Sequence, residues 1–158
     1  MDAADRLIRL YTSSVKADFV ALIALILGLV ALVILSKGLL RHFENTGGGK
    51  IGSKAVLFVA VGALLVGIGY YSYQEVLYAR DKSAVENREF ETVRGKVIEH
   101  TGATDSNKPS LYDYTGVVIE LENGETMRLK QRSGQLRTQL GKTYEFIYLE
   151  HSRLSVAK

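Results

Sequence analysis

The residues best suited to chemistry in this chain are three histidines, some clustered carboxylates and one run of basic residues. His42, His100 and His151 are far apart, and none shows the H-x-x-x-H or H-E-x-x-H spacing that places two metal ligands on one helix face. A site joining His100 and His151 to a carboxylate such as Asp113 is chemically allowed, but solvated turns are the more common setting for such residues. We therefore predict neither a metal centre nor a bound cofactor.

Covalent catalysis and phosphate binding also lack their usual patterns. The chain has no cysteine, and no serine lies in a G-x-S-x-G elbow. Gly47-Gly48-Gly49 precedes Lys50 without the full spacing of a phosphate-binding loop. Glu120, Glu122 and Glu125 flank an Asn-Gly turn and are expected to be solubilising. We predict that the protein is not an enzyme.

Basic residues are concentrated between positions 128 and 142. Arg128, Lys130 and Arg132 alternate with Met127 and Leu129, as on one face of a strand. They could meet anionic lipid headgroups or an acidic partner. The alternative is an ordinary outward face of a half-buried strand. Nucleic acid is not expected, because stacking aromatic residues are not evident beside these positions. The possible lipid or partner contacts are Arg128, Lys130, Arg132, Arg137 and Lys142.

Two uncharged apolar runs, Phe19–Leu35 and Ala55–Gln74, dominate the first half of the chain. Crossing the hydrocarbon core takes about 17–25 residues, which both runs supply. The first run is longer than the apolar part of a usual signal peptide, and no small-x-small cleavage site follows it. We predict a transmembrane hairpin in which each run is a retained helix.

The expected division of the chain follows from these runs. The segments are an amphipathic lead-in (1–17), transmembrane helix 1 (18–36), a glycine-containing linker (37–54), transmembrane helix 2 (55–74), a helical linker (75–89) and a β-rich domain (90–158). The lead-in is expected to form the first turns of the following helix rather than a separate surface helix.

The second run carries two further patterns. Small residues allow helices to approach closely in lipid, against either the first run or another copy of the protein. Tyrosines at the end of the run are typical of an interfacial belt. The predicted helix-packing residues are Gly62, Ala63, Gly67 and Gly69, and the predicted membrane-interface residues are Tyr70, Tyr71, Tyr73 and Tyr78.

The charges that flank the two runs bear on orientation. Lys37 and Lys54 directly abut the runs on the linker side, which favours a cytoplasmic linker and places both chain ends outside. Arg80 and Lys82 on the other side favour the opposite orientation. We predict an outward-facing C-terminal domain.

After Phe90 the pattern changes to short strands, predicted at 93–99, 114–121, 126–131, 143–149 and 153–156. Between the second and third of these, a two-residue turn would place Ile119 opposite Arg128. A three-residue turn with Gly124 in the left-handed region instead pairs Ile119 with Met127, which burial favours. Five strands predict a small SH3-like or OB-like barrel, since closure removes exposed edges.

Segments 116–126, 140–148 and 154–156 resemble an uncharacterised family of small bacterial membrane proteins. The stretch from Leu140 to Val156 is also similar to the last strands of NfeD-like OB domains. The resemblance implies a β-domain beside membrane helices in a bacterial inner membrane, with the C-terminal domain periplasmic on the charge argument. NfeD-like domains are associated with membrane scaffold proteins of the stomatin–flotillin type.

Two functions follow as hypotheses. The first is a membrane-anchored interaction module that acts as an accessory, scaffold or regulatory subunit of a larger membrane complex. The second is a self-assembling membrane protein that forms a homo-oligomeric pore or transport accessory. Neither run carries an Asp, Glu, His, Lys or Arg residue, so nothing marks an ion pathway within one subunit.

Overall fold

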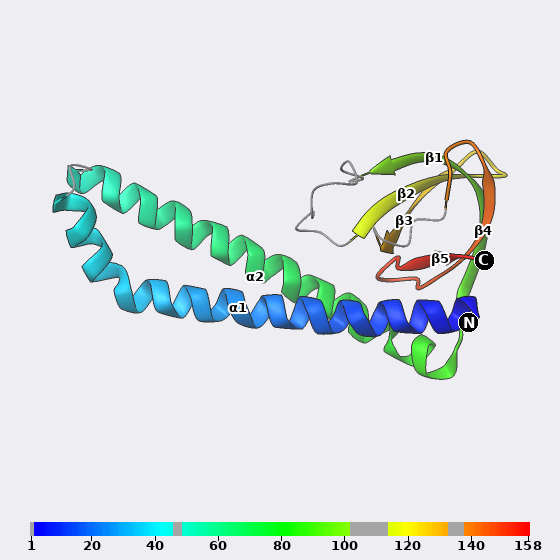
Figure 1. Cartoon of the computed structure of the whole chain (residues 1–158), viewed down its shortest axis with the longest axis horizontal. Helices are drawn as coiled ribbons and strands as arrows, with labels where there is room; N and C mark the ends of the chain where they lie inside the picture. The colour runs from blue at the N-terminus through cyan, green and yellow to red at the C-terminus, as the bar shows by residue number, and fades with distance from the viewer. Residues whose placement is uncertain (1, 46–48, 102–113, 133–137) are drawn as a thin grey trace. The chain divides into compact units, whose positions relative to one another are not determined.

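The chain consists of two long helices followed by a five-stranded sheet. A computed structural model describes residues 2–45, 49–101, 114–132 and 138–158 (Figure 1). The elements are α1 (Ala3–Asn45), α2 (Gly49–Asn87), β1 (Glu91–Thr101), β2 (Tyr114–Leu121), β3 (Thr126–Arg132), β4 (Thr143–Tyr148) and β5 (Ser155–Ala157). The predicted combination of helices and strands is confirmed.

Both helices are longer than the apolar runs within them. The lead-in belongs to α1 and the predicted helical linker to α2, while α1 ends at Asn45 and α2 begins at Gly49. Residues 46–48 of the predicted linker lie outside the described residues. Ala3–Ser36 and Lys54–Asn87 are long and apolar enough to cross a membrane, and the most apolar window of each has 0% of its residues buried. Length and composition therefore make both helices candidate membrane spans.

The described residues divide into two compact units. The first contains Met1–Ser14 and Leu77–Lys158, so it joins the first turns of α1 and the last turns of α2 to the sheet. The second contains Val15–Val76, the apolar parts of the two helices.

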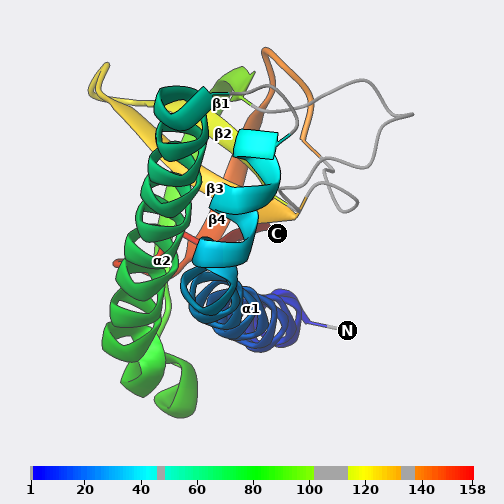
Figure 2. The same cartoon turned by 90° about the vertical axis from the view of Figure 1, so that its left-hand side faces the viewer.

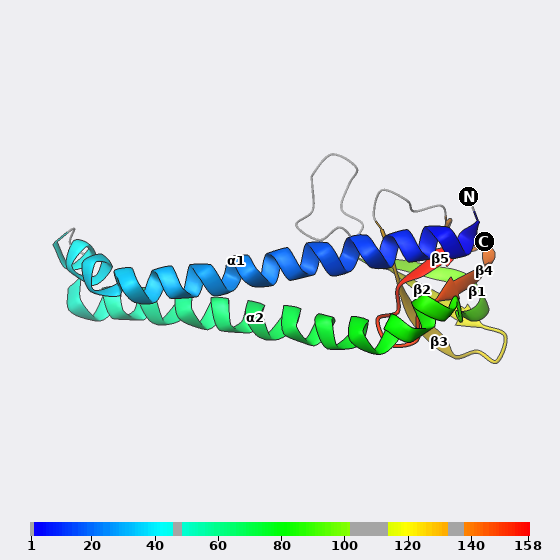
Figure 3. The ribbon, with the colours of Figure 1, turned by 90° about the horizontal axis from the view of Figure 1, so that it is seen from below.

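In the second unit, α1 and α2 run side by side in opposite directions (Figures 1 and 3). A Cβ added at Gly67 would lie 3.0 Å from Leu25 Cδ1, and one added at Gly28 would lie 3.9 Å from Leu64 Cδ2. The helices therefore approach each other where glycine leaves room.

The sheet is antiparallel, with strand order β3-β2-β1-β4-β5. Its strands twist strongly relative to one another (Figure 2). Five fully buried side chains form the core between them: Val97, Val117, Ile119, Leu129 and Phe146. These residues alternate with more exposed ones along β1, β2 and β3, which is the pattern of a sheet with one buried face.

The predicted three-residue turn between β2 and β3 is confirmed. Ile119 pairs with Met127 and Val117 with Leu129, and Gly124 has a φ of 82°. The Leu121 N–H donates to Glu125 O at 2.8 Å, and the Gly124 N–H donates to Leu121 O at 3.0 Å. The register that buries Ile119 prevails because a shift of one residue would turn it to the solvent face.

The predicted closed barrel is wrong, because the sheet stays open. Its two edge strands, β3 and β5, meet in one isolated parallel bridge between Lys130 and Leu154. The Lys130 N–H donates to Arg153 O at 2.8 Å there. Strand β5 spans three residues, since the chain before it forms a turn from Leu149 to Leu154 rather than a longer strand. One bridge cannot continue the ladder around the sheet.

Candidate functional site: the helix–sheet joint

The first unit contains a polar joint between the helix ends and the sheet. We define this helix–sheet joint as Asp5, Arg6 and Tyr11 of α1, Tyr78 and Asp81 of α2, Arg88, and the turn 149–154 between β4 and β5. All of these residues belong to the compact unit that contains the sheet. The joint determines how the ends of the two helices are attached to the folded sheet.

Asp81 is the central residue of the joint. Its carboxylate is buried and accepts two backbone hydrogen bonds, from His151 N–H at 3.0 Å and from Ser152 N–H at 2.8 Å. In the same turn the Arg153 N–H donates to Leu149 O at 3.0 Å, which makes one helical turn. The first N–H groups of a helical turn lack partners within it, and the Asp81 carboxylate supplies an acceptor for two of them.

The first turns of α1 are attached to the other end of the hairpin. Arg6 Nη2 donates to Ala157 O of β5 at 3.0 Å. Leu7 and Leu10 on the same helix are buried, which explains the amphipathic pattern of the lead-in as a packing face. The β4–β5 hairpin thus receives contacts from both helices.

The two helices also contact each other inside the joint. The Tyr11 hydroxyl donates to Tyr78 O at 2.9 Å, and the two rings meet edge to face with centroids 5.9 Å apart. Arg88 forms an ion pair with Asp5 just after α2 ends. Because these contacts join the start of α1 to the end of α2, both helix ends stay together at the sheet.

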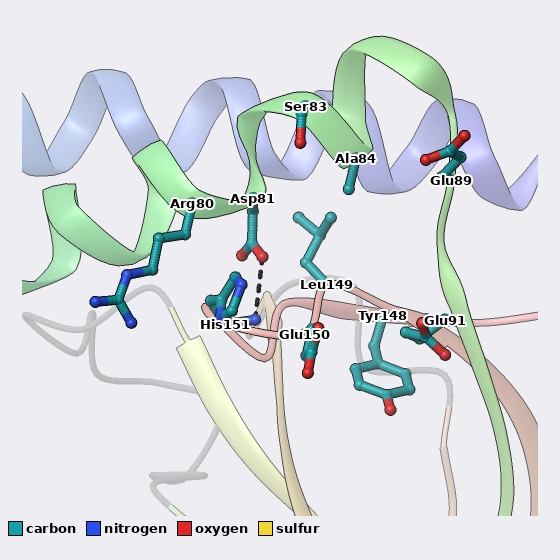
Figure 4. A pocket seen from close by; sticks show the side chains of 10 residues that line it. All are labelled: Arg80, Asp81, Ser83, Ala84, Glu89, Glu91, Tyr148, Leu149, Glu150 and His151. Atoms are coloured by element: carbon teal, nitrogen blue, oxygen red, sulfur yellow. Dashed lines mark hydrogen bonds between the residues drawn. The ribbon is translucent and has the colours of Figure 1, made fainter.

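A polar pocket of about 170 Å³ lies beside Asp81 (Figure 4). Leu149 points toward α2 between Asp81 and Ala84, while Glu91, Tyr148 and Glu150 line the strand side (Figure 4). Among the residues that the structure describes, no group of three His, Cys, Asp or Glu side chains is arranged to hold a metal ion. The Asp81 carboxylate is already occupied by two amides, so its role here is to hold the turn.

Two buried polar atoms of the joint, Arg6 Nε and Ser152 Oγ, have no hydrogen-bond partner among the described residues. An unpaired buried polar group lowers stability by about 1–3 kcal/mol. The joint therefore does not maximise its own stability.

The predicted helix-packing residues differ in their surroundings. Gly67 faces Leu25 of α1, whereas a Cβ added at Gly62 or Gly69 would meet nothing within 4 Å. Ala63 is exposed within the chain. Gly67 thus lies at the contact between α1 and α2, and the other three lie away from it.

The predicted tyrosine belt divides between the two units. Tyr70 and Tyr71 pack edge to face with centroids 5.3 Å apart, and Tyr73 is exposed, all in the second unit. Tyr78 is buried against Tyr11 in the joint. A role at the membrane interface stays a prediction for these residues.

The described basic residues do not form a single patch. Arg128 is exposed and Lys130 half-buried on β3. Lys142 directly precedes β4, and its carbonyl accepts a hydrogen bond from the N–H of Val97 in β1 at 2.9 Å. Arg137 and the side chain of Arg132 lie outside the described residues. The strand order separates Lys142 from β3 by β1 and β2.

The residues of the joint were not predicted as a site from the sequence. Asp81 is one acidic residue in a charged helical segment, and its two partners lie far along the chain in a turn. The only local sign was the amphipathic pattern of the lead-in.

Comparisons with protein-family models, curated proteins and solved structures found no match to this chain. The resemblance to NfeD-like domains and to small bacterial membrane proteins accordingly stays a prediction.

Proposed function

We propose that this protein is a non-enzymatic, membrane-anchored module that serves as an accessory, scaffold or regulatory subunit of a larger membrane complex. The observation that carries the proposal is the exposed apolar surface of both helices, whose most apolar windows have 0% of their residues buried within the chain. Side chains such as Phe58 (82% exposed) and Val66 (74% exposed) need cover from lipid or from another protein.

The joint supports the same proposal. Contacts from both helices reach the β4–β5 hairpin, so the sheet is attached to the helices without a long linker. A sheet held in this way can present one face to a partner at the membrane surface. The proposed location is a bacterial inner membrane with the C-terminal sheet on the periplasmic side. The proposed partners are the bilayer and a membrane protein, without nucleic acid.

Affinity purification from gently solubilised native membranes tests this function. The tagged full chain is expected to co-purify with a different membrane protein at a fixed stoichiometry. A variant that lacks the exposed charge of Glu122 serves as a control that should not change the composition. Recovery of the chain alone, or in the soluble fraction, would contradict the proposal.

A second candidate function is self-assembly. Gly62 and Gly69, seven residues apart on α2, both face open space within the chain. Small residues at this spacing would allow another copy to approach closely. A closed homo-oligomer in a mass measurement of the solubilised protein would favour this function over the first.

A further inference from the structure

Strand β3 is an open edge of the sheet (Figure 1). Its residues direct their main-chain N–H and C=O groups alternately to β2 and to the open side. In the β2–β3 hairpin the Leu121 N–H bonds to Glu125 O, and Ile119 pairs with Met127 and Val117 with Leu129. In an antiparallel ladder, hydrogen-bonded pairs alternate with pairs whose main-chain groups point outward. The main-chain groups of Met127 and Leu129 therefore point to β2, and those of Thr126, Arg128 and Lys130 point to the open edge.

The contacts of Lys130 confirm that its main-chain groups point away from β2. Its N–H donates to Arg153 O at 2.8 Å, and its carbonyl accepts from Ser155 Oγ at 3.2 Å. Among the described residues, no other bridge extends along this edge toward Thr126. Thr126 and Arg128 thus present N–H and C=O groups to the outside, next to a position where pairing already occurs.

The charges beside this edge differ along its length. Arg128 is exposed on the outer face, and Lys130 follows it. On the core side the Arg153 guanidinium lies 5.7 Å from the centroid of the Tyr148 ring, with its Nη1 3.9 Å from Met127 Sδ. Acidic residues lie at the turn end of the edge, where Glu120 of β2 pairs with Thr126 and Glu125 precedes β3. Positive charge on both sides of the edge therefore begins at Arg128 and continues toward Lys130.

We propose that the β3 edge at residues 126–128 binds an extended acidic segment of a partner protein, which adds a strand beside β3 up to the position where Lys130 is already paired. Unpaired main-chain groups of an edge strand are the usual template for strand addition. The charge of Arg128, Lys130 and Arg153 selects for acidic residues in the added strand. Pairing with a second copy of β3 is disfavoured, because antiparallel identical strands would place these like charges opposite one another.

This inference rests on the proposed function and names the chemistry of the partner. The test uses the full chain in detergent and a labelled peptide of alternating valine and glutamate, with an alternating valine and lysine peptide as the control. The glutamate peptide is expected to bind and to slow hydrogen exchange at the amides of Thr126 and Arg128. The lysine peptide is expected not to bind.

Two variants of Arg128 distinguish the contribution of its main-chain N–H to peptide binding from that of its side-chain charge. Arg128→Pro removes the outward N–H without touching the β2 ladder, and proline is tolerated on edge strands in this orientation. It should weaken peptide binding about tenfold or more, equivalent to about 1.4 kcal/mol. Arg128→Ala keeps the N–H and removes only the charge, so it should weaken binding by a smaller factor.

Several results would overturn the inference. The first is hydrogen exchange that the glutamate peptide slows only at amides outside β3 of the unmodified chain. The others are equal binding of the two peptides, and binding of the glutamate peptide to Arg128→Pro that is as strong as to the unmodified chain. A change of oligomeric mass in Arg128→Pro would instead identify a second copy as the occupant. If the native partner still co-purifies with Arg128→Pro at unchanged yield, the inference fails while the proposed function stands. If no partner co-purifies with the unmodified chain, the proposed function fails.

Discussion

At the scale of single residues, Asp81 carries the attachment of α2 to the sheet. Replacing Asp81 by alanine leaves the amides of His151 and Ser152 without their acceptor. We expect the free energy of unfolding to fall by about 2–4 kcal/mol, since each unsatisfied buried group lowers stability by about 1–3 kcal/mol. Thermal unfolding of the detergent-solubilised chain measures the change.

Ser152→Ala is the matched control in the same turn. It keeps the amide that Asp81 binds and removes a buried hydroxyl that has no partner. Its stability should be unchanged or higher by up to about 1 kcal/mol. Equal losses in Asp81→Ala and Ser152→Ala would show that the turn tolerates no change of side chain, and that the Asp81 bonds are not special.

Arg88, which directly follows α2, allows a separate test of backbone strain. Arg88 has a φ of 57°, and Glu89 N–H donates to Ala84 O at 2.8 Å, which closes the helix with a left-handed residue. Arg88→Gly should relieve this strain, whereas Arg88→Ala keeps it, and both lose the exposed ion pair to Asp5. We expect Arg88→Gly to be more stable than Arg88→Ala by about 1 kcal/mol in thermal unfolding.

Asp5→Ala completes this comparison. The Arg88–Asp5 pair is exposed, and such pairs contribute about 0–1 kcal/mol. A loss in Asp5→Ala larger than the difference between Arg88→Gly and Arg88→Ala would mean that the ion pair, rather than the backbone, dominates this helix end.

At the scale of elements, Gly67 determines how closely α1 and α2 pack. Gly67→Ala places a methyl group 3.0 Å from Leu25 Cδ1, so the leucine must shift by a few tenths of an ångström. Alanine at either Gly67 or Gly69 adds helix propensity, so we expect Gly67→Ala to be less stable than Gly69→Ala by about 1–2 kcal/mol, as for other overpacked contacts. Unfolding in detergent, followed by circular dichroism, measures the loss.

Gly69→Ala is the matched control on the same helix. Nothing lies within 4 Å of its added Cβ, so stability should stay constant or rise slightly through helix propensity. A fall in oligomeric mass on Gly69→Ala would instead support the self-assembly function.

The helices and the β2–β3 hairpin were the elements most accessible from the sequence. Burial of Ile119 and a left-handed glycine at position 124 were enough to choose the register of β2 and β3 from the residue pattern alone. Barrel closure could not be predicted in the same way. Strand β5 has only three residues because the turn 149–154 precedes it, and Asp81 of a distant helix binds that turn. No local pattern in the sequence records this contact.

At the scale of the whole molecule, the protein joins a sheet directly to the ends of two candidate membrane spans. The apolar runs predicted the two candidate spans, because hydrophobicity is a local property of the chain. The joint was missed, because its bonds join residues separated by about half the sequence, such as Asp81 and Ser152. The partner was likewise not readable, since an open strand edge appears only once the strand order is known.

Cysteine accessibility in native membranes tests the membrane anchoring of the helices most directly, because the chain has no cysteine of its own. Leu27→Cys lies in the apolar part of α1, and Glu122→Cys lies in the exposed β2–β3 turn. We expect a membrane-impermeant maleimide to label position 122 and to leave position 27 unlabelled until the membrane is dissolved and the protein denatured. Labelling of position 27 in intact membranes, or recovery of the chain in the soluble fraction, would contradict a membrane-spanning hairpin.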